Sequence, residues 1–201
     1  KSLADNLTGN NNVAIGTSAL ENTTVALLNV AVGQEAMGGI TTNAVQDVVA
    51  IGVQALKGAG GTTTGANGTI AIGRSALAAL TSGAGNTAVG YQSLDGITTS
   101  AQNTAVGYSA LTAVGDSYAN TAVGYQAGDT ISNTGAFNVC IGTDADVSTG
   151  SADNQIVIGR ATTGVANNSV TLGNSAVTAV YMAEDSGAKV HCGRADLITN
   201  Y

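Results

Sequence analysis

The chain lacks proline and tryptophan, and its 201 residues include only one histidine and two cysteines. Aromatic residues make up 3% of the sequence and charged residues 9%. So few large side chains cannot fill the wide core of an ordinary globular domain. Two cysteines are too few for a disulfide scaffold. A single histidine, without paired carboxylates at recurrent positions, gives little support to hydrolytic chemistry.

Positive charge is also scarce. Six basic residues stand against thirteen acidic ones, which gives a net charge of −7. This balance opposes the attraction to phosphate that drives most nucleic-acid binding, so we expect no nucleic-acid partner. No apolar run approaches the roughly 18 residues of a membrane span, and the first ten residues, "KSLADNLTGN", have no apolar signal region. We therefore expect no direct membrane insertion.

The residues that are abundant are small or branched. Glycine supplies 28 positions, and the 44% hydrophobic content consists largely of Ala, Val, Ile and Leu. A chain this apolar is not a disordered tail. Its composition favours a narrow interior lined by small and β-branched side chains.

One phrase recurs along most of the chain. "NTAVGYQ" occupies residues 86–92 and again 120–126, and "NTAVGY" occupies 103–108. The residue before its glycine is always a branched aliphatic, the residue two before it is nearly always small, and the residue three before it is β-branched. This period-two pattern predicts one short, two-faced strand per unit. The glycine recurs at steps of 17, 19, 21, 17, 17, 17, 18, 17 and 14 residues, at Gly16, Gly33, Gly52, Gly73, Gly90, Gly107, Gly124, Gly142, Gly159 and Gly173.

The length of the unit selects the fold class. About 17 residues are too few for a helical-hairpin repeat of about 34 or a propeller blade of about 40. The unit fits one coil of a β-solenoid, whose neighbouring strands lie roughly 4.8 Å apart, so nine steps span about 43 Å. We predict an all-β protein, a parallel β-roll of about ten coils. Each slot then forms a ladder of like residues, which is most regular at Ala88, Val89, Gly90, Ala105, Val106, Gly107, Ala122, Val123 and Gly124.

The other slots carry separate expectations. Glycine suits a corner that needs a positive φ or close backbone approach. Asparagine opens many units, as at Asn103, and is expected to adopt turn geometry and bond its own backbone. A small–aliphatic pair after the glycine, such as Ala110 and Leu111, predicts a return strand. The variable linkers, such as residues 57–68 and 81–85, should be exposed loops.

Three regions follow from the extent of the repeat. Residues 1–11 are expected to form an N-terminal cap or lead-in, and residues 12–177 the β-roll. Residues 178–201 are expected to form a small C-terminal β-hairpin cap, with residues 184–187, "EDSG", as its turn. Such a cap would protect the open strand edge of the last coil.

A coil of this size can enclose only one face of each strand. Our interpretation places the alanines inside, which leaves the branched residues as an apolar stripe along the rod. Three copies around a three-fold axis would bury that stripe, so we predict a homotrimer. The opposite facing, with the branched residues inside, fits the alternation equally and stays open.

Exposed ladders are the candidate recognition sites. Tyr91, Tyr108 and Tyr125 follow the glycine on three successive coils. They are candidates for receptor binding, because a tyrosine face stacks on sugar rings and its hydroxyl is polar. The alternative, which we favour, is that the rings stack on one another or pack at a subunit boundary. A second ladder, of threonines at positions 87, 104 and 121, raises ice binding, but it is short.

His191 and Cys192 are the only neighbouring pair with catalytic or metal-ligand chemistry. Adjacent strand residues point to opposite faces, so one chain cannot aim both at one ion or substrate. Three copies of His191 could meet on a symmetry axis and bind a metal, but an ordinary strand histidine is the simpler reading. Cys140 occupies the alanine slot and is expected to be a small buried hydrophobe.

The acidic residues Asp144, Asp146 and Asp153 lack the spacing of a calcium-binding loop and are expected to be solvated. The glycine-rich linkers lack the Gly-Lys-[Ser/Thr] of a phosphate-binding loop. We therefore expect no catalytic site, no metal and no cofactor, and predict that the protein is not an enzyme.

The phrases "NNVAIGTSAL", "NVAVGQEAM", "TIAIGRSAL", "NTAVGYQSL" and "NVCIGTDAD" resemble the head repeats of YadA-like trimeric adhesins. The resemblance covers about residues 12–177 and implies a left-handed parallel β-roll in a homotrimer. Phage tail-fibre shafts carry the same repeat. Most units here are 17 residues long, whereas many adhesin heads use 14 or 15. The chain also has no recognisable heptad stalk or β-barrel anchor, and its C-terminal segment is similar in style to viral fibre proteins.

Three functions are weighed on this basis. The first is a structural segment of a phage-type tail fibre that serves host-surface attachment. The second is the head of a bacterial trimeric autotransporter adhesin for cell or matrix adhesion, and the third is a fibre with hydrolase activity against surface polysaccharide. Under the first two, the partners are a host cell-surface glycan or protein receptor and, for a fibre, other fibre or virion proteins at its ends. The expected location is extracellular, on a virion tail fibre or a bacterial cell surface.

Overall fold

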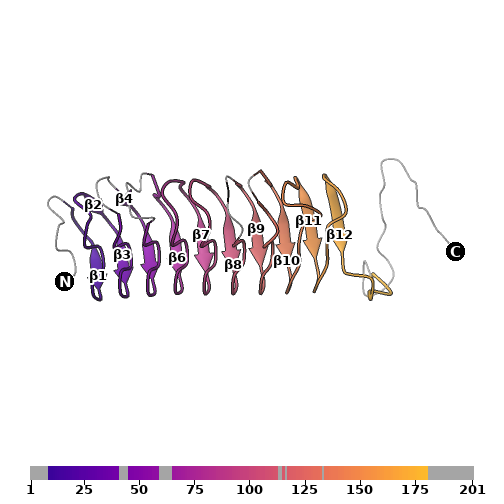
Figure 1. Cartoon of the computed structure of the whole chain (residues 1–201), viewed down its shortest axis with the longest axis horizontal. Coiled ribbons are helices and arrows are strands. Elements are labelled where there is room, and N and C mark those ends of the chain that lie inside the picture. The colour runs from indigo at the N-terminus through magenta and orange to yellow at the C-terminus, as the bar shows by residue number, and fades with distance from the viewer. Residues whose placement is uncertain are drawn as a thin grey trace, which may run out of the picture.

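The computed structural model describes residues 9–40, 45–58, 65–112, 115, 117–132 and 134–180, which form a rod of stacked coils (Figure 1). This part of the chain contains strands, turns and loops, and within it no helix is long and apolar enough to cross a membrane. The predicted β-solenoid is confirmed. A single parallel sheet runs the length of the rod, and its ten strands stack in chain order as β1 (Val13–Ile15), β3 (Val30–Val32), β5 (Val49–Ile51), β6 (Ile70–Ile72), β7 (Thr87–Val89), β8 (Thr104–Val106), β9 (Thr121–Val123), β10 (Val139–Ile141), β11 (Gln155–Ile158) and β12 (Ser169–Leu172).

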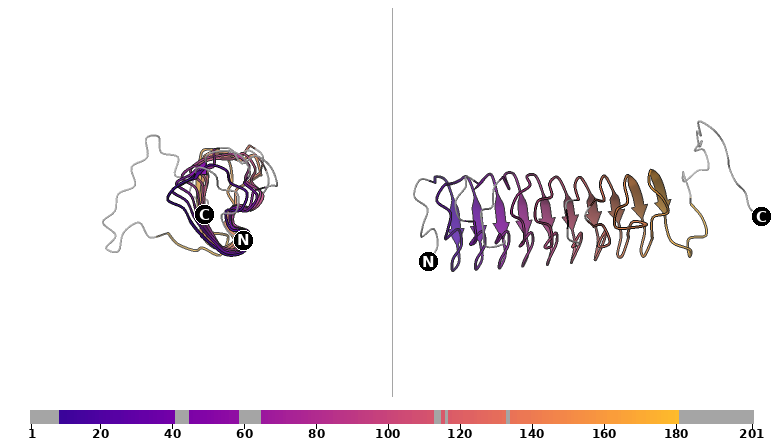
Figure 2. Two further views of the ribbon diagram at one scale, coloured as in Figure 1. Left: turned by 90° about the vertical axis from the view of Figure 1, so that its left-hand side faces the viewer. Right: turned by 45° about the horizontal axis from the view of Figure 1, so that its top comes forward.

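The register of the sheet pairs each slot with the same slot of the next coil. Ala105 lies between Ala88 and Ala122. The 19-residue and 21-residue units keep this register, since Val49 pairs with Val30 on one side and Ile70 on the other. A second, two-stranded sheet joins β2 (Ala26–Leu27) to β4 (Val45–Gln46). Viewed along the rod, the coils superpose (Figure 2).

The alanine slot faces the interior. Ala88, Ala105 and Ala122 are fully buried, whereas Val106 and Val123, one position further along the same strands, lie on the outside. The placement of alanine inside is confirmed and the opposite facing is wrong. The short alanine side chain leaves room for a second buried ladder that projects from the segment after the glycine, made of Leu20, Met37, Leu56, Leu77, Leu94 and Leu111.

The segment after the glycine is a turn, so the prediction of a return strand there is wrong. Ala110 and Leu111 are both buried, although consecutive strand residues would point to opposite sides. Leu111 has φ 52° and Ser109 has φ 49°, so every second residue is left-handed. This alternation turns both side chains inward. The backbone still bonds to the next coil, since the N–H of Leu111 donates to the carbonyl of Ala127 at 3.0 Å.

The asparagine ladder makes the predicted contact with its own turn and also bonds the next coil. Asn103 is fully buried, and its Nδ2 donates to the carbonyl of Ala101 in its own turn at 3.2 Å. Its Oδ1 accepts from the backbone N–H of Asn120, and its Nδ2 donates to the carbonyl of Ser117, both at 3.0 Å. Asn120 and Asn138 repeat the arrangement one coil further on. Each asparagine therefore clamps two backbone groups that would otherwise be buried without partners.

The glycine corner meets both expected conditions. Gly107 has φ +147°, a conformation that residues with a Cβ avoid. A Cβ built there would also collide with the carbonyl oxygen of Gly124 in the next coil. The same collision recurs at the corners from Gly16 to Gly142, so these corners require glycine because of the coil stacked on them.

Several predicted features lie largely outside the described residues. These are the N-terminal cap of residues 1–11, most of the C-terminal hairpin of residues 178–201, and part of the linker 57–68. His191 and Cys192 belong to the same group.

We expect Gly107→Ala to lower the free energy of unfolding by about 3 kcal/mol or more, because it adds backbone strain and a clash with Gly124. Gly85→Ala is the matched control. Gly85 has φ +70°, but nothing lies within 4 Å of its Cβ position, so the loss should be about 1 kcal/mol. Thermal unfolding followed by circular dichroism measures both. Equal losses in the two variants would contradict the stacking origin of the corner glycine.

The asparagine ladder is interrupted at Val48 and Thr69, and this gap predicts a stabilising substitution. Thr69 is fully buried and its hydroxyl has no partner among the described groups. Asparagine has almost the same volume and would reach the backbone of Asn86 and Gly83 in the next coil. Thr69→Asn should raise the free energy of unfolding by about 1–2 kcal/mol.

The reverse substitution is the control. Asn103→Thr creates the same gap within the intact part of the ladder and should cost about 2–4 kcal/mol, because it leaves two buried backbone groups unpaired. If chemical denaturation showed that Thr69→Asn destabilises the rod, the clamp would not be a general source of stability.

Candidate functional site

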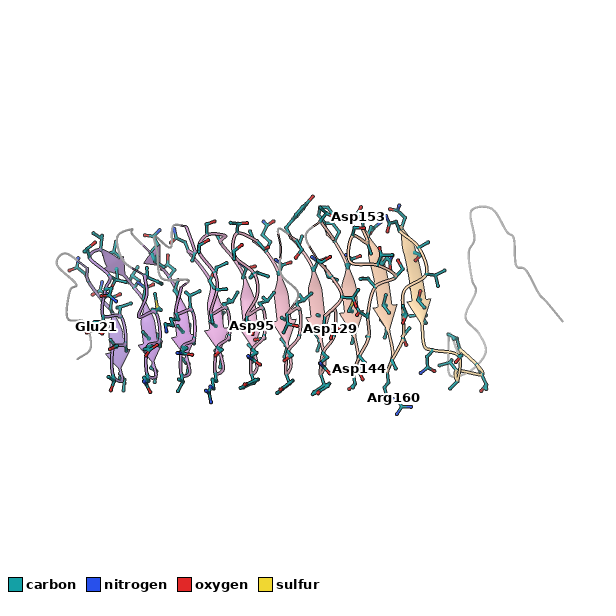
Figure 3. The ribbon with its side chains drawn as sticks, viewed as in Figure 1. Glu21, Asp95, Asp129, Asp144, Asp153 and Arg160 are labelled. Carbon is teal, nitrogen blue, oxygen red and sulfur yellow. The ribbon has the colours of Figure 1, made fainter. Side chains whose placement is uncertain are left out.

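The rod presents three outward surfaces. The sheet face consists of the outward side chains of the ten-stranded sheet. The corner edge consists of the residues just after each glycine, such as Asp144 and Arg160. The loop edge consists of the residues just before each asparagine slot, such as Asp153. Figure 3 shows Asp144 and Arg160 on one edge of the rod and Asp153 on the opposite edge.

The sheet face is an apolar surface with one polar interval. Two outward columns, three residues and one residue before the glycine, carry only Val, Ile, Leu and Thr. Their most exposed members are 37–61% accessible to solvent. The threonines Thr87, Thr104 and Thr121 line up in the first column, as predicted. Neither column contains a charged residue, although the chain carries a net charge of −7.

The tyrosine ladder lies on the corner edge. Tyr91 and Tyr108 have ring centroids 5.0 Å apart, and Tyr108 and Tyr125 have centroids 5.1 Å apart, each pair with an interplanar angle of 12°. The backbone sets this spacing, because the carbonyl of each tyrosine accepts from the N–H one residue beyond the tyrosine slot of the next coil, as from Ser109 to Tyr91 at 2.9 Å. The rings are 39–47% exposed.

This stacking changes what the ladder offers a ligand. Both faces of the Tyr108 ring are covered by its neighbours, so a sugar ring cannot stack on it. The surface that remains is a row of ring edges and phenolic hydroxyls, with one outer face each on Tyr91 and Tyr125. The rings stack on one another, which is one form of the alternative that the sequence analysis favoured. A receptor would contact the edges and hydroxyls.

A second aromatic pair lies on the loop edge. Tyr118 and Phe137 meet edge to face, with ring centroids 5.1 Å apart and an interplanar angle of 84°. They are 46% and 52% exposed. The sequence reading missed them because they occupy neighbouring but different slots, so they form no ladder. Their position could have revealed them, because Tyr118 lies two residues before Asn120 and Phe137 lies one residue before Asn138 in the asparagine ladder.

All the aromatic side chains of the described residues therefore lie on the surface. They are confined to residues 91–137, in the middle of the rod. A buried aromatic ring ordinarily contributes a large apolar area to a core. The described coils instead fill their interior mainly with Ala, Leu, Ile, Val and Asn and present their aromatic rings outward.

One pair of carboxyl groups interacts across adjacent coils. Burial, and then a hydrogen bond and repulsion from Asp146, raise the pKa of Asp129 from its ordinary 3.8 to about 6. Asp146 accepts from the backbone N–H groups of Thr130 at 3.1 Å and Val147 at 2.8 Å. The two residues sit in adjacent coils. Sequence reasoning missed the pair because the two carboxyls come from neighbouring slots.

The remaining predicted residues have no shared site. Asp144 and Asp153 lie on opposite edges of the rod, and Asp146 is bonded to the backbone (Figure 3). Cys140 is buried in the alanine ladder, as expected, and burial followed by the charge of Asp146 raises the pKa of its thiol to about 12. The described residues contain neither a pocket nor a group of three or more potential metal ligands among His, Cys, Asp and Glu.

The Asp129–Asp146 pair predicts how stability depends on pH. Because the folded-state pKa of Asp129 lies above its unfolded value, its protonated form stabilises the fold below about pH 4, and that stability is lost as the pH rises through about 6. Asp129→Asn keeps a hydrogen-bond donor toward Asp146 without the ionisation. The variant should match the original protein at pH 4 and unfold at a higher temperature at pH 7.

Asp144→Asn, which removes an exposed carboxylate from the corner edge, serves as the control for net charge. Thermal unfolding is measured between pH 4 and pH 7. At neutral pH the melting temperature should be higher in the Asp129→Asn variant and unchanged in the Asp144→Asn variant. The same shift in both variants would assign the effect to overall charge.

Comparison of the chain with protein-family models, with curated proteins and with solved structures gives no match.

Proposed function

We propose that three copies of this chain associate side by side around an axis parallel to the rod and form a structural fibre. The fibre is a left-handed β-roll trimer that serves attachment to a host surface, as a segment of a phage-type tail fibre. It performs no catalysis. Its ends contact other fibre or virion proteins, and its recognition surfaces contact a glycan or protein receptor.

The observation that carries this proposal is the sheet face. A charge-free surface of branched aliphatic residues, interrupted by three threonines in one column, runs over ten coils, or about 43 Å at the spacing of β-strands. A continuous apolar surface of that length on an extracellular rod is an interaction surface. The partner must present an equally long and regular surface with the same 4.8 Å repeat. A second copy of the chain has that property, and cyclic symmetry closes the assembly.

The two aromatic groups support the attachment role. When the sheet face is buried against other copies, the corner edge and the loop edge stay on the outside of the assembly. The Tyr91, Tyr108 and Tyr125 ladder and the Tyr118–Phe137 pair would then be repeated three times around the fibre. Weak contacts that are repeated on one rigid rod reinforce each other, because the second contact forms at a high effective concentration.

The same rod would serve as the head of a bacterial trimeric adhesin, which the repeated phrase also resembles. Electron microscopy of the native source with a labelled antibody separates the two. Label on rods that project from virions supports the tail fibre, and label on the cell surface supports the adhesin.

The trimer can be tested with a single charge. Native mass measurement should give three times the 19.5 kDa of one chain. Val106→Glu places a charge in the middle of the sheet face, and we expect it to yield monomers, because burying an unpaired carboxylate is costly. Gln102→Glu adds the same charge on the loop edge and should remain trimeric. A monomeric original protein, or a trimeric Val106→Glu variant, would contradict the assembly.

A further inference from the structure

The three threonines on the sheet face interrupt an otherwise aliphatic column. In the column three residues before the glycine, Thr87, Thr104 and Thr121 occupy successive coils, between Ile70 on one side and Val139 on the other. The column is otherwise Val or Ile from the first coil to the last. We call these three residues the threonine belt.

The hydroxyls of the belt have no hydrogen-bond partner among the described residues of the same chain. In an isolated rod, water satisfies them. Once the sheet face is covered, each hydroxyl needs a new partner, because a buried hydroxyl without one is penalised.

We propose that the threonine belt sets the axial register of the trimer and that its column lies next to the three-fold axis. This inference rests on the proposed trimer. At each height of the belt, three hydroxyls from three copies meet, and each donates to the next around a closed ring. One hydroxyl supplies one donor and accepts through its lone pairs, so the ring satisfies all three.

The aliphatic residues on either side of the belt distinguish the correct axial register from a shifted one. If one copy slips by a single coil, one threonine faces Ile70 of another copy and another faces Val139. Each slip therefore buries unpaired hydroxyls at both ends of the belt. Aliphatic ladders alone would tolerate such a slip, because Val and Ile columns present nearly the same surface at every height. The belt is the feature that distinguishes one height from another.

The partner is therefore a second copy of this chain, in the same register. Only another copy carries hydroxyls on three successive coils at the matching height. The outward column one residue before the glycine, with Val89, Val106 and Val123 at these heights, offers no such partner. In the proposed assembly the threonine column meets itself, which places it at the axis, and the phenolic hydroxyls of Tyr91, Tyr108 and Tyr125 lie away from it on the corner edge.

Thiol cross-linking tests which column lies at the axis. The test uses the full chain with Cys140→Ala and Cys192→Ser. Thr104→Cys should form disulfide-linked dimers of chains under mild oxidation, because three thiols meet at one height. Val106→Cys, on the same strand and also outward, is the matched control and should link at least about tenfold less. Preferential linking of Val106→Cys would overturn the proposal.

A mixing experiment tests the register. One chain keeps its belt. The other carries the belt three coils earlier, through Thr87→Val, Thr104→Val, Thr121→Val, Val30→Thr, Val49→Thr and Ile70→Thr. Refolded together, the two should form mixed trimers about tenfold below the statistical proportion, because each mixed trimer leaves buried hydroxyls unpaired. Differently tagged copies of the original chain should mix statistically.

The possible outcomes separate the two proposals. Monomers in every sample, with circular dichroism unchanged, would overturn the trimer itself. Trimers in which the two belts mix statistically would overturn the register function of the threonines and leave the trimer intact. A shifted-belt chain that folds and forms trimers only with itself would support both.

Discussion

The hydrogen bonds between successive coils are the constraint from which the rest of the structure follows. Each coil donates to and accepts from its neighbours through the backbone, along the strand and through the turn after it. Those bonds form only if consecutive coils follow the same path. The residues at equivalent positions of successive coils therefore adopt the same backbone conformation. The glycine corner, the left-handed turn residues and the buried asparagines are all consequences of that repeated path.

This constraint also determines where chemistry can be placed. Slots that face the interior admit alanine, leucine and asparagine, since each side chain is covered by its copies on either side. Variation is left to the outward slots, where Arg160 and Asp144 occupy positions that hold tyrosine or serine elsewhere. The aromatic rings and the threonine belt both fall in the middle coils. The rod therefore has uniform architecture and a chemically distinct centre.

Slots with a strict period were predictable, and slots with an unusual backbone were not. The two-faced strand Thr104–Val106 follows from alternation, and the corner at Gly107 follows from the special conformations of glycine. Leu111 was misread because a left-handed leucine contradicts its intrinsic preference, and only the bond to the next coil sustains it. The role of Asn103 was predicted only in part for a related reason, since the two partners in the next coil lie fourteen and seventeen residues away.

The sequence by itself determined the unit, its stacking and the composition of the outward columns, because all three are local properties repeated at a fixed interval. Only the tertiary structure decided which strand face is enclosed, how the tyrosine rings cover one another, and that burial and Asp146 raise the pKa of Asp129. These features depend on the distance between coils and on the curvature of each coil. Both arise when the backbone closes on itself, and no single unit contains them.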